Sequence, residues 1–169
     1  HRFPVQTINI RLMVASLPGV AAFYRALTGS PQGKGLNPLF FVSSSPWNMY
    51  DLLEQFFQIE NIPQGHVLFL RDWGLDENEF LPIRHKEFKA ETIQQIMDFY
   101  EELPFILIGD SGQEDPEIYC ELVKKYPQRI LAVYIRNVSQ DFKRTAEMLE
   151  LAQEVLAAGS TLILADNTL

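Results

Sequence analysis

The sequence predicts an α/β fold with a mainly parallel sheet and helices on both faces of that sheet. Short runs rich in Val, Ile, Leu and Phe alternate with longer stretches whose apolar residues recur at helical spacing. The short runs are apolar at nearly every position, which is typical of parallel strands buried on both faces. The length of 169 residues fits one domain, which we place at residues 1–169.

The apolar runs predict five strands, separated by stretches that predict helices. The strands are Leu39–Ser43, His66–Leu70, Phe105–Gly109, Ile130–Ile135 and Thr161–Ala165. The helices are Gly19–Leu27, Pro46–Ile59, Lys89–Tyr100, Pro116–Lys125 and Gln140–Ala158. Between the first helix and the first strand, residues 28–38 form a Gly/Pro-rich surface loop.

The helix predicted at residues 46–59 has the clearest local signals. Its apolar residues Met49, Leu52, Leu53, Phe56 and Phe57 fall on one face. Pro46 suits the first helical position, and Ser45 before it suits the N-cap. The three consecutive serines 43–45 thus leave two hydroxyls, at Ser43 and Ser44, that capping does not explain.

Composition excludes several functional classes. The net charge is −8 and no Lys/Arg cluster interrupts the acidic background, so we expect no nucleic-acid partner and at most peripheral contact with an anionic membrane. No apolar run approaches the ~20 residues that span a bilayer, and the N-terminus lacks a signal-peptide layout. The single cysteine, Cys120, rules out an internal disulfide and fits a cytoplasmic location.

Ligands of parallel α/β sheets bind at the carboxyl ends of the strands, so the segments after the predicted strands are candidates for the site. Ser43 ends the first strand and faces the start of the next helix. Its hydroxyl, with Ser44 and nearby backbone N–H groups, could hold a phosphate there. The alternative is that both serines only satisfy the backbone of the loop.

The segment "FILIGDSGQEDPEIY" (105–119) carries two carboxylates on one short loop. Asp110 directly follows an apolar strand, and Asp115 precedes Pro116. Mg²⁺ binds a few carboxylate oxygens together with waters and substrate phosphate, so the pair is a candidate metal site. Asp115 also reads as the N-cap of the next helix. "GDSG" resembles serine hydrolase motifs, but all three histidines lie upstream of Ser111, which argues against that chemistry.

Two further segments carry candidate residues. In "LRDWG", Arg71 and Asp72 pair in a turn or face a substrate, and Trp73 is a lid residue or a buried anchor of the loop. In "IRHKEFKAE", Lys89 lies at the start of the predicted helix, where a cation opposes the helix dipole. The alternative for Lys89 is a solvated basic helix start.

The segments "FFVSSSPWNMYDLL", "LFLRDWG", "PFILIGDSGQEDPEIY" and "RILAVYIRNV" resemble the catalytic domain of the actin-patch-protein type of phosphatidate phosphatase. The resemblance runs from about Pro18 to the C-terminus. That family belongs to the haloacid dehalogenase (HAD) superfamily. The resemblance implies a HAD-like, Rossmann-type three-layer sandwich and a Mg²⁺-dependent phosphatase. The substrate would be a phosphomonoester, either a phosphatidate-like lipid or a soluble compound.

The resemblance also implies roles for individual residues. Ser43 matches the superfamily's second motif, a hydroxyl that binds the transferring phosphoryl group, and Ser44 adjoins it. Lys89 matches the third motif, a lysine that neutralises charge between nucleophile and phosphate, although Phe88 stands where the family usually has His. Asp110 and Asp115 match the fourth motif, which positions Mg²⁺.

The first superfamily motif, D-x-D-x-T, supplies the nucleophilic aspartate and the general acid, and no D-x-D occurs in the 169 residues. The sequence then has two interpretations: a catalytic domain whose nucleophile strand lies upstream, or a phosphate-binding or scaffold module without turnover. The intact second to fourth motifs favour the first. On this basis we expect the 169-residue chain by itself to be inactive.

Overall fold

The computed structural model describes residues 19–29, 37–46, 49–63, 67–71, 82–139 and 141–165. Contacts divide the chain into two units. The first unit comprises His1–Leu75 and Thr168–Leu169, and the second comprises Asp76–Asn167. Of the helices in the described ranges, none combines the length and hydropathy needed to cross a bilayer.

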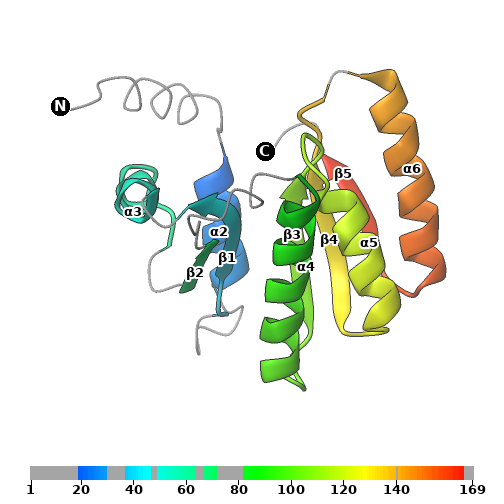
Figure 1. Ribbon diagram of the computed structural model, residues 1–169, viewed down its shortest axis with the longest axis horizontal. Helices are drawn as coiled ribbons and strands as arrows, with labels where there is room; N and C mark the ends of the chain where they lie inside the picture. Colours follow the sequence, from blue (N-terminus) through cyan, green and yellow to red (C-terminus); the bar gives the residue numbers. More distant parts are fainter. Residues whose placement is uncertain are drawn as a thin grey trace. The chain divides into compact units, whose positions relative to one another are not determined.

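The described residues of the first unit form a two-stranded parallel sheet and two helices (Figure 1). In chain order they are α2 (Val20–Thr28), β1 (Phe40–Pro46), α3 (Tyr50–Ile59) and β2 (Val67–Arg71). Aromatic side chains join α2 and α3 to β1, because the Phe41 ring stacks on Phe57 at 4.5 Å and meets Tyr24 edge-on at 5.7 Å between centroids. Burial raises the pKa of Tyr24.

The predicted start of the helix after β1 is wrong. Strand β1 continues through Pro46, which pairs with Arg71, and the pairing register shifts between Ser43 and Pro46. Helix α3 begins only at Tyr50, and Met49 in its N-cap position provides no side-chain hydrogen bond. Ser45 is therefore not the cap. A proline at the irregular end of a strand costs little, because its missing N–H is not needed there.

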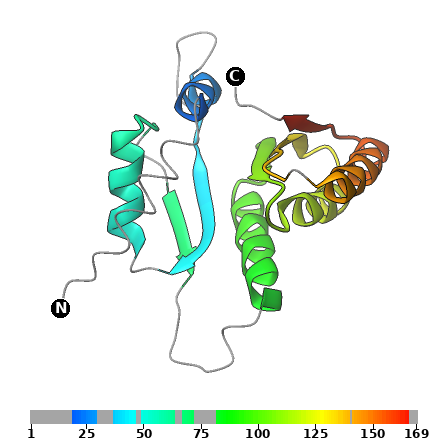
Figure 2. The same ribbon diagram turned by 90° about the horizontal axis from the view of Figure 1, so that it is seen from above.

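The second unit alternates helix and strand throughout. Its elements are α4 (Pro82–Phe99), β3 (Phe105–Asp110), α5 (Asp115–Lys125), β4 (Ile130–Arg136), α6 (Phe142–Ala157) and β5 (Leu162–Ala165). The strands form a parallel sheet in the order β3-β4-β5. Both crossovers run in the same direction along the sheet, and the usual right-handed connection then places α5 and α6 on one face. Figure 2 shows them on the same side. The α/β class and parallel pairing are confirmed.

The core of this unit lies between the sheet and that helical layer. Its fully buried side chains include Met97, Leu122, Val133, Ile135 and Val155. On the opposite face of the sheet, Ile106 and Ile163 are 40% and 36% exposed. Helices on both faces, and hence three layers, are not seen within the described part of this unit, and that prediction stays open.

The C-terminal end of α4 is held by Arg129. Its guanidinium donates hydrogen bonds to the carbonyl oxygens of Met97 (3.0 Å), Tyr100 (2.7 Å) and Leu103 (3.0 Å). The last carbonyls of a helix have no partners within the helix, so Arg129 satisfies acceptors that would otherwise need water. This anchors α4, the helix that carries Lys89.

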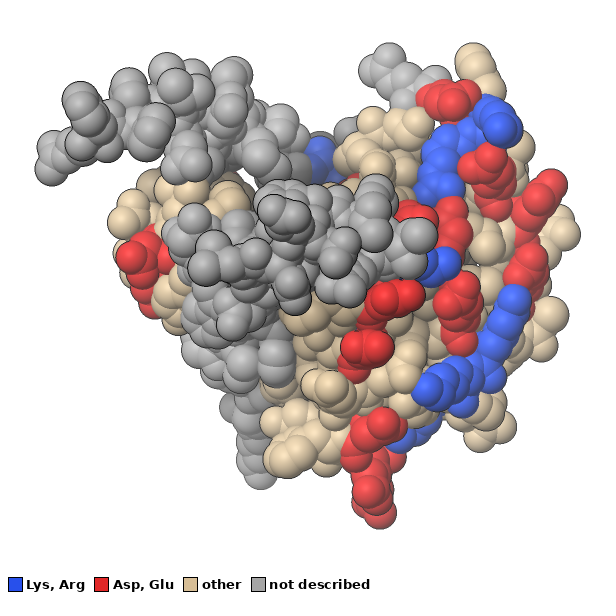
Figure 3. Space-filling view, viewed as in Figure 1, with Lys and Arg blue, Asp and Glu red and all other residues tan. Residues whose placement is uncertain are grey.

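Charged side chains are interspersed over α4, α5 and α6 on the face seen in Figure 3. Lys86 pairs with Glu121 at 3.2 Å between α4 and α5, and Lys124 pairs with Glu154 at 2.6 Å between α5 and α6. Ion pairs that are this exposed to solvent contribute little to stability. They join neighbouring helices on the outer surface.

Candidate functional site

Asp110 is the last residue of β3, at the carboxyl edge of the sheet as predicted. Its Oδ1 accepts a hydrogen bond from the backbone N–H of Gly112 at 2.8 Å, which folds the chain into a tight turn after the strand. The next residue, Ser111, continues the sheet contact by donating its N–H to the carbonyl oxygen of Arg136 at 2.9 Å. Residues 110–114, called here the Asp110 loop, therefore begin in a fixed position.

Asp115 is buried behind this loop, with 4% of its surface exposed. Its Oδ2 accepts a hydrogen bond from the backbone N–H of Asp110 at 3.3 Å, and its Oδ1 forms an ion pair with Lys89 Nζ. The predicted N-cap role is wrong, because Asp115 is the first helical residue of α5 and Glu114 occupies the cap position. Asp115 instead connects the end of β3, through the Asp110 N–H, to α4, through Lys89.

The prediction that Lys89 lies at the start of a helix is wrong. Helix α4 begins at Pro82, which places Lys89 about two turns inside it. The argument from the helix dipole therefore does not apply. Only 16% of the Lys89 side chain is exposed, so the alternative of a solvated helix start is also wrong. The structure brings Lys89, Asp110 and Asp115 together in one cluster.

Gly109 makes room for this cluster. A Cβ built at Gly109 would lie 2.7 Å from Asp115 Cβ and 2.9 Å from Asp115 Cγ, and it would overlap Oδ2 even more closely. Real Cβ atoms essentially never approach other atoms this closely. The buried carboxylate of Asp115 thus packs directly against the bare backbone of β3.

Replacing Gly109 with Ala is expected to lower the free energy of unfolding by about 1–3 kcal/mol, because the added methyl group displaces Asp115. The matched control is Gly29→Ala, where the nearest atom lies at 3.3 Å and φ is −71°, and where we expect a change within about 1 kcal/mol. Urea unfolding followed by circular dichroism measures both. Equal stabilities of the two variants would contradict the packing described for Asp115.

Ser111 fastens the Asp110 loop to the chain that follows β4. Its buried Oγ accepts hydrogen bonds from the N–H groups of Val138 (2.9 Å) and Ser139 (3.1 Å) and donates to Asn137 Oδ1 at 3.2 Å. All the acceptor and donor capacity of this hydroxyl is used in these contacts. Ser111 therefore has a structural role, which agrees with the argument against a serine hydrolase.

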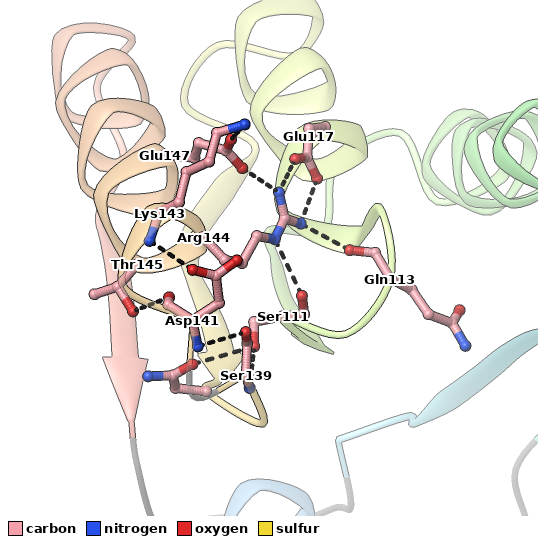
Figure 4. A network of polar contacts seen from close by, with 10 residues as sticks. Ser111, Gln113, Glu117, Ser139, Asp141, Lys143, Arg144, Thr145 and Glu147 are labelled. Atoms are coloured by element: carbon pink, nitrogen blue, oxygen red, sulfur yellow. Dashed lines mark hydrogen bonds and ion pairs between the residues drawn. The ribbon is translucent and has the colours of Figure 1, made fainter.

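Arg144 of α6 reaches the other side of the same loop, as Figure 4 shows. Its Nε donates to the carbonyl oxygen of Ser111 at 3.1 Å, and its Nη2 donates to that of Gln113 at 2.8 Å. The guanidinium also forms a bidentate ion pair with Glu117 of α5, which includes an Nη2–Oε2 contact of 3.1 Å. A further contact of 3.3 Å joins Nη1 to Glu147.

The ion pair between Arg144 and Glu117 stabilises the charged form of both side chains. Partial burial by itself would raise the pKa of Glu117, but the hydrogen bond and positive charge of Arg144 outweigh it, and the net effect is a lowered pKa. The hydrogen bond to Glu117 in turn raises the pKa of Arg144. Sequence reasoning missed Arg144, because its partners lie about thirty residues away and no local pattern connects them.

The remaining predicted site residues belong to the first unit. Ser43 is half-buried in β1 and pairs with Leu70. The backbones of Ser44 and Arg71 lie in β1 and β2, but their side chains are outside the described part of the structure. Asp72 and Trp73 lie outside the described residues altogether.

The cluster of Lys89, Asp110 and Asp115 fits a Mg²⁺ ion that has few protein ligands. Among the described residues, no group of three or more His, Cys, Asp or Glu side chains gathers around a common point. Mg²⁺ commonly takes only one or two carboxylates and completes its shell with waters and phosphate oxygens. Asp110 uses Oδ1 for Gly112, which leaves carboxylate lone pairs for a cation. Asp115, engaged with Lys89 and Asp110, fits an orienting role.

The family model described as "Phosphatidate phosphatase APP1, catalytic domain" matches residues 6–137 of the chain. The chain belongs to this family. The match contains every candidate residue named above from Ser43 to Asp115. It begins earlier than the resemblance recognised from the sequence, which started near Pro18, and it ends before α6.

The chain is similar to two curated proteins from yeasts. An uncharacterized protein of Schizosaccharomyces pombe is 31% identical over 138 residues, which are 80% of this chain and 22% of that protein. Phosphatidate phosphatase APP1 of Saccharomyces cerevisiae is 34% identical over 100 residues, which are 59% of this chain and 17% of that protein. The chain thus spans less than a quarter of the length of either relative. No solved structure matches it.

Proposed function

We propose that the protein is a Mg²⁺-dependent phosphatase of the HAD type that hydrolyses a phosphomonoester, with phosphatidate-like lipids as the substrate class. The observation that carries the proposal is the cluster of Asp110, Asp115 and Lys89 at the carboxyl end of β3, in a chain of the phosphatidate phosphatase family. An acidic pair beside a lysine suits phosphoryl transfer, which depends mainly on positioning and charge neutralisation.

In this proposal each residue has a defined task. Asp110 binds Mg²⁺ directly, and the ion neutralises charge on the phosphoryl oxygens when it is bound. Asp115 orients Asp110 through the backbone N–H and holds the Lys89 ammonium beside the carboxylates. Lys89 in turn screens the negative charge that accumulates around the phosphate.

Five further residues are proposed to contact the phosphate or the substrate. Ser43 donates its hydroxyl to a phosphoryl oxygen, with Ser44 beside it, and the loop that contains Arg71, Asp72 and Trp73 contacts the substrate. These assignments rest on the family, whose match includes all five residues.

The chemical step requires a nucleophile that the 169 residues do not supply in a D-x-D motif. We propose that an aspartate elsewhere in the protein attacks phosphorus, while the substrate alcohol leaves with a proton from a general acid. Water then hydrolyses the aspartyl-phosphate and releases inorganic phosphate. Cys120 is a buried free thiol, which supports a cytoplasmic location for this activity.

The test measures release of inorganic phosphate by the protein expressed from its complete coding sequence. Substrates are phosphatidate diluted in phosphatidylcholine vesicles and the water-soluble monoester glycerol 3-phosphate, each with Mg²⁺ or with EDTA. We expect Mg²⁺-dependent release that is faster from phosphatidate. Faster release from glycerol 3-phosphate would make the substrate a soluble ester. Binding of phosphate without turnover of either substrate would contradict the phosphatase and identify a binding module.

A further inference from the structure

The Asp110 loop is held from two sides by residues that do not belong to the proposed metal–phosphate cluster. On one side, Ser111 Oγ joins the loop to the backbone N–H groups of Val138 and Ser139. On the other side, Arg144 donates to the carbonyl oxygens of Ser111 and Gln113. Both groups are at the loop itself, within a few residues of Asp110 and Asp115.

Arg144 connects the loop to α5 and α6. One guanidinium bridges two loop carbonyls and the carboxylate of Glu117, which lies in the first turn of α5 after Asp115. The Arg144 side chain is 19% exposed. Its bonds to Ser111 and Glu117 are partly buried, and its bond to Gln113 lies at the surface. Figure 4 shows the side chain extending from α6 between the loop and α5. The segment from Ser111 to Glu117 is therefore attached to α6 through Arg144.

We propose that Arg144 is a positioning residue for the metal site: it holds the Asp110 loop so that the Asp110 carboxylate faces the cation. The inference rests on the proposed function, and it adds a residue of α6 that lies beyond the family match of residues 6–137. Groups that orient metal ligands typically change metal affinity about 10–100-fold when they are removed. Arg144 acts through the loop and does not itself touch substrate or metal.

The geometry requires arginine at this position. The planar guanidinium carries five N–H donors in a fixed arrangement, which allows it to serve two carbonyls and a carboxylate at the same time. A lysine ammonium is a compact charge that can stay near Glu117 but cannot reproduce the two loop contacts from the same place. Arg144→Lys therefore separates the electrostatic pairing with Glu117 from the positioning of the loop.

The experiment compares Arg144→Met, Arg144→Lys and the control Lys143→Met in the protein expressed from its complete coding sequence. Lys143 is the neighbouring cation on α6, has a side chain that is 84% exposed, and contacts Glu147 only at 3.8 Å. The first measurement is the Mg²⁺ concentration that gives half-maximal phosphate release. The second is the hydrogen-exchange rate of the Gly112 amide, which reports on its hydrogen bond to Asp110 Oδ1.

We expect Arg144→Met to raise the half-maximal Mg²⁺ concentration about 10–100-fold and to speed exchange at Gly112, with Lys143→Met unchanged in both. Arg144→Lys should recover stability but little of the Mg²⁺ affinity. If Arg144 only supports folding, Arg144→Met lowers the maximal rate through loss of folded protein and leaves the Mg²⁺ dependence as in the wild type. That result would overturn the inference. If the proposed function is wrong, the wild-type protein itself shows no Mg²⁺ dependence, and the inference is then overturned with it.

Discussion

Replacing Lys89 with Met is expected to lower the free energy of unfolding by about 3–5 kcal/mol, the cost of leaving one partner of a buried ion pair uncompensated. The Asp115 side chain is 5% exposed, and the Lys89 side chain is 16% exposed. Without Lys89, Oδ1 of Asp115 loses the cation that compensates its burial, and the backbone N–H of Asp110 remains on Oδ2. Chemical denaturation in urea measures the change.

The same helix offers a matched control for this prediction. Lys86 pairs with Glu121, and their side chains are 33% and 65% exposed, so Lys86→Met should cost at most about 1 kcal/mol. Adding Asp115→Asn to Lys89→Met removes both charges and should restore part of the lost stability. A loss for Lys89→Met no greater than that for Lys86→Met would show that Lys89 and Asp115 do not form a buried pair.

The second large effect is expected on catalysis. Asp110→Asn should reduce Mg²⁺-dependent phosphate release at least about 100-fold, or about 2.7 kcal/mol of transition-state stabilisation, because the amide no longer attracts a cation. Its oxygen can still accept from the Gly112 N–H, so the turn and the stability should persist. The control is Asp98→Asn on α4, whose carboxylate accepts from the Tyr126 hydroxyl on the outer surface. Initial rates at fixed Mg²⁺ make the comparison.

The placement of Asp110 was predictable from the sequence because it depends on simple physics. An apolar run too short for a helix and followed by Gly and Asp indicates a buried strand with a carboxylate at its end. Parallel connection then brings that end to the edge where ligands bind. The position of Asp115 on the same loop followed from its closeness in the chain. Its ion pair with Lys89 did not, since it depends on how α4 packs against α5.

The errors in the prediction arose where tertiary contacts outweighed local preferences. Ser45 and Pro46 carry good N-terminal helix signals, yet pairing of β1 with β2 continues the strand through both residues. For α4, the sequence did contain a usable signal: Pro82 occupies the first helical position, a place that proline favours. That signal would have moved the predicted start from Lys89 to Pro82 and shown Lys89 as a residue of the helix interior.

Arg144 could not have been found from any local pattern. It looks like one of many charged residues on an amphipathic helix, and its neighbour Lys143 carries the same charge. What distinguishes the two is the direction of each side chain, which the packing of α6 against α5 and β5 determines. The sequence also predicted a second layer of helices, on the face of the sheet that carries Ile106 and Ile163. The periodicity of the strands does not indicate which segment would form that layer, because this depends on tertiary contacts.

The proposed phosphatase requires that the carboxylate at the end of β3 holds a divalent cation. Mn²⁺, which prefers the same oxygen ligands as Mg²⁺, allows a direct titration by electron paramagnetic resonance of the complete protein, with Asp110→Asn and Asp98→Asn as comparisons. We predict that the wild type and Asp98→Asn bind Mn²⁺ in competition with Mg²⁺, and that Asp110→Asn loses this binding. Equal binding by all three proteins would contradict the account.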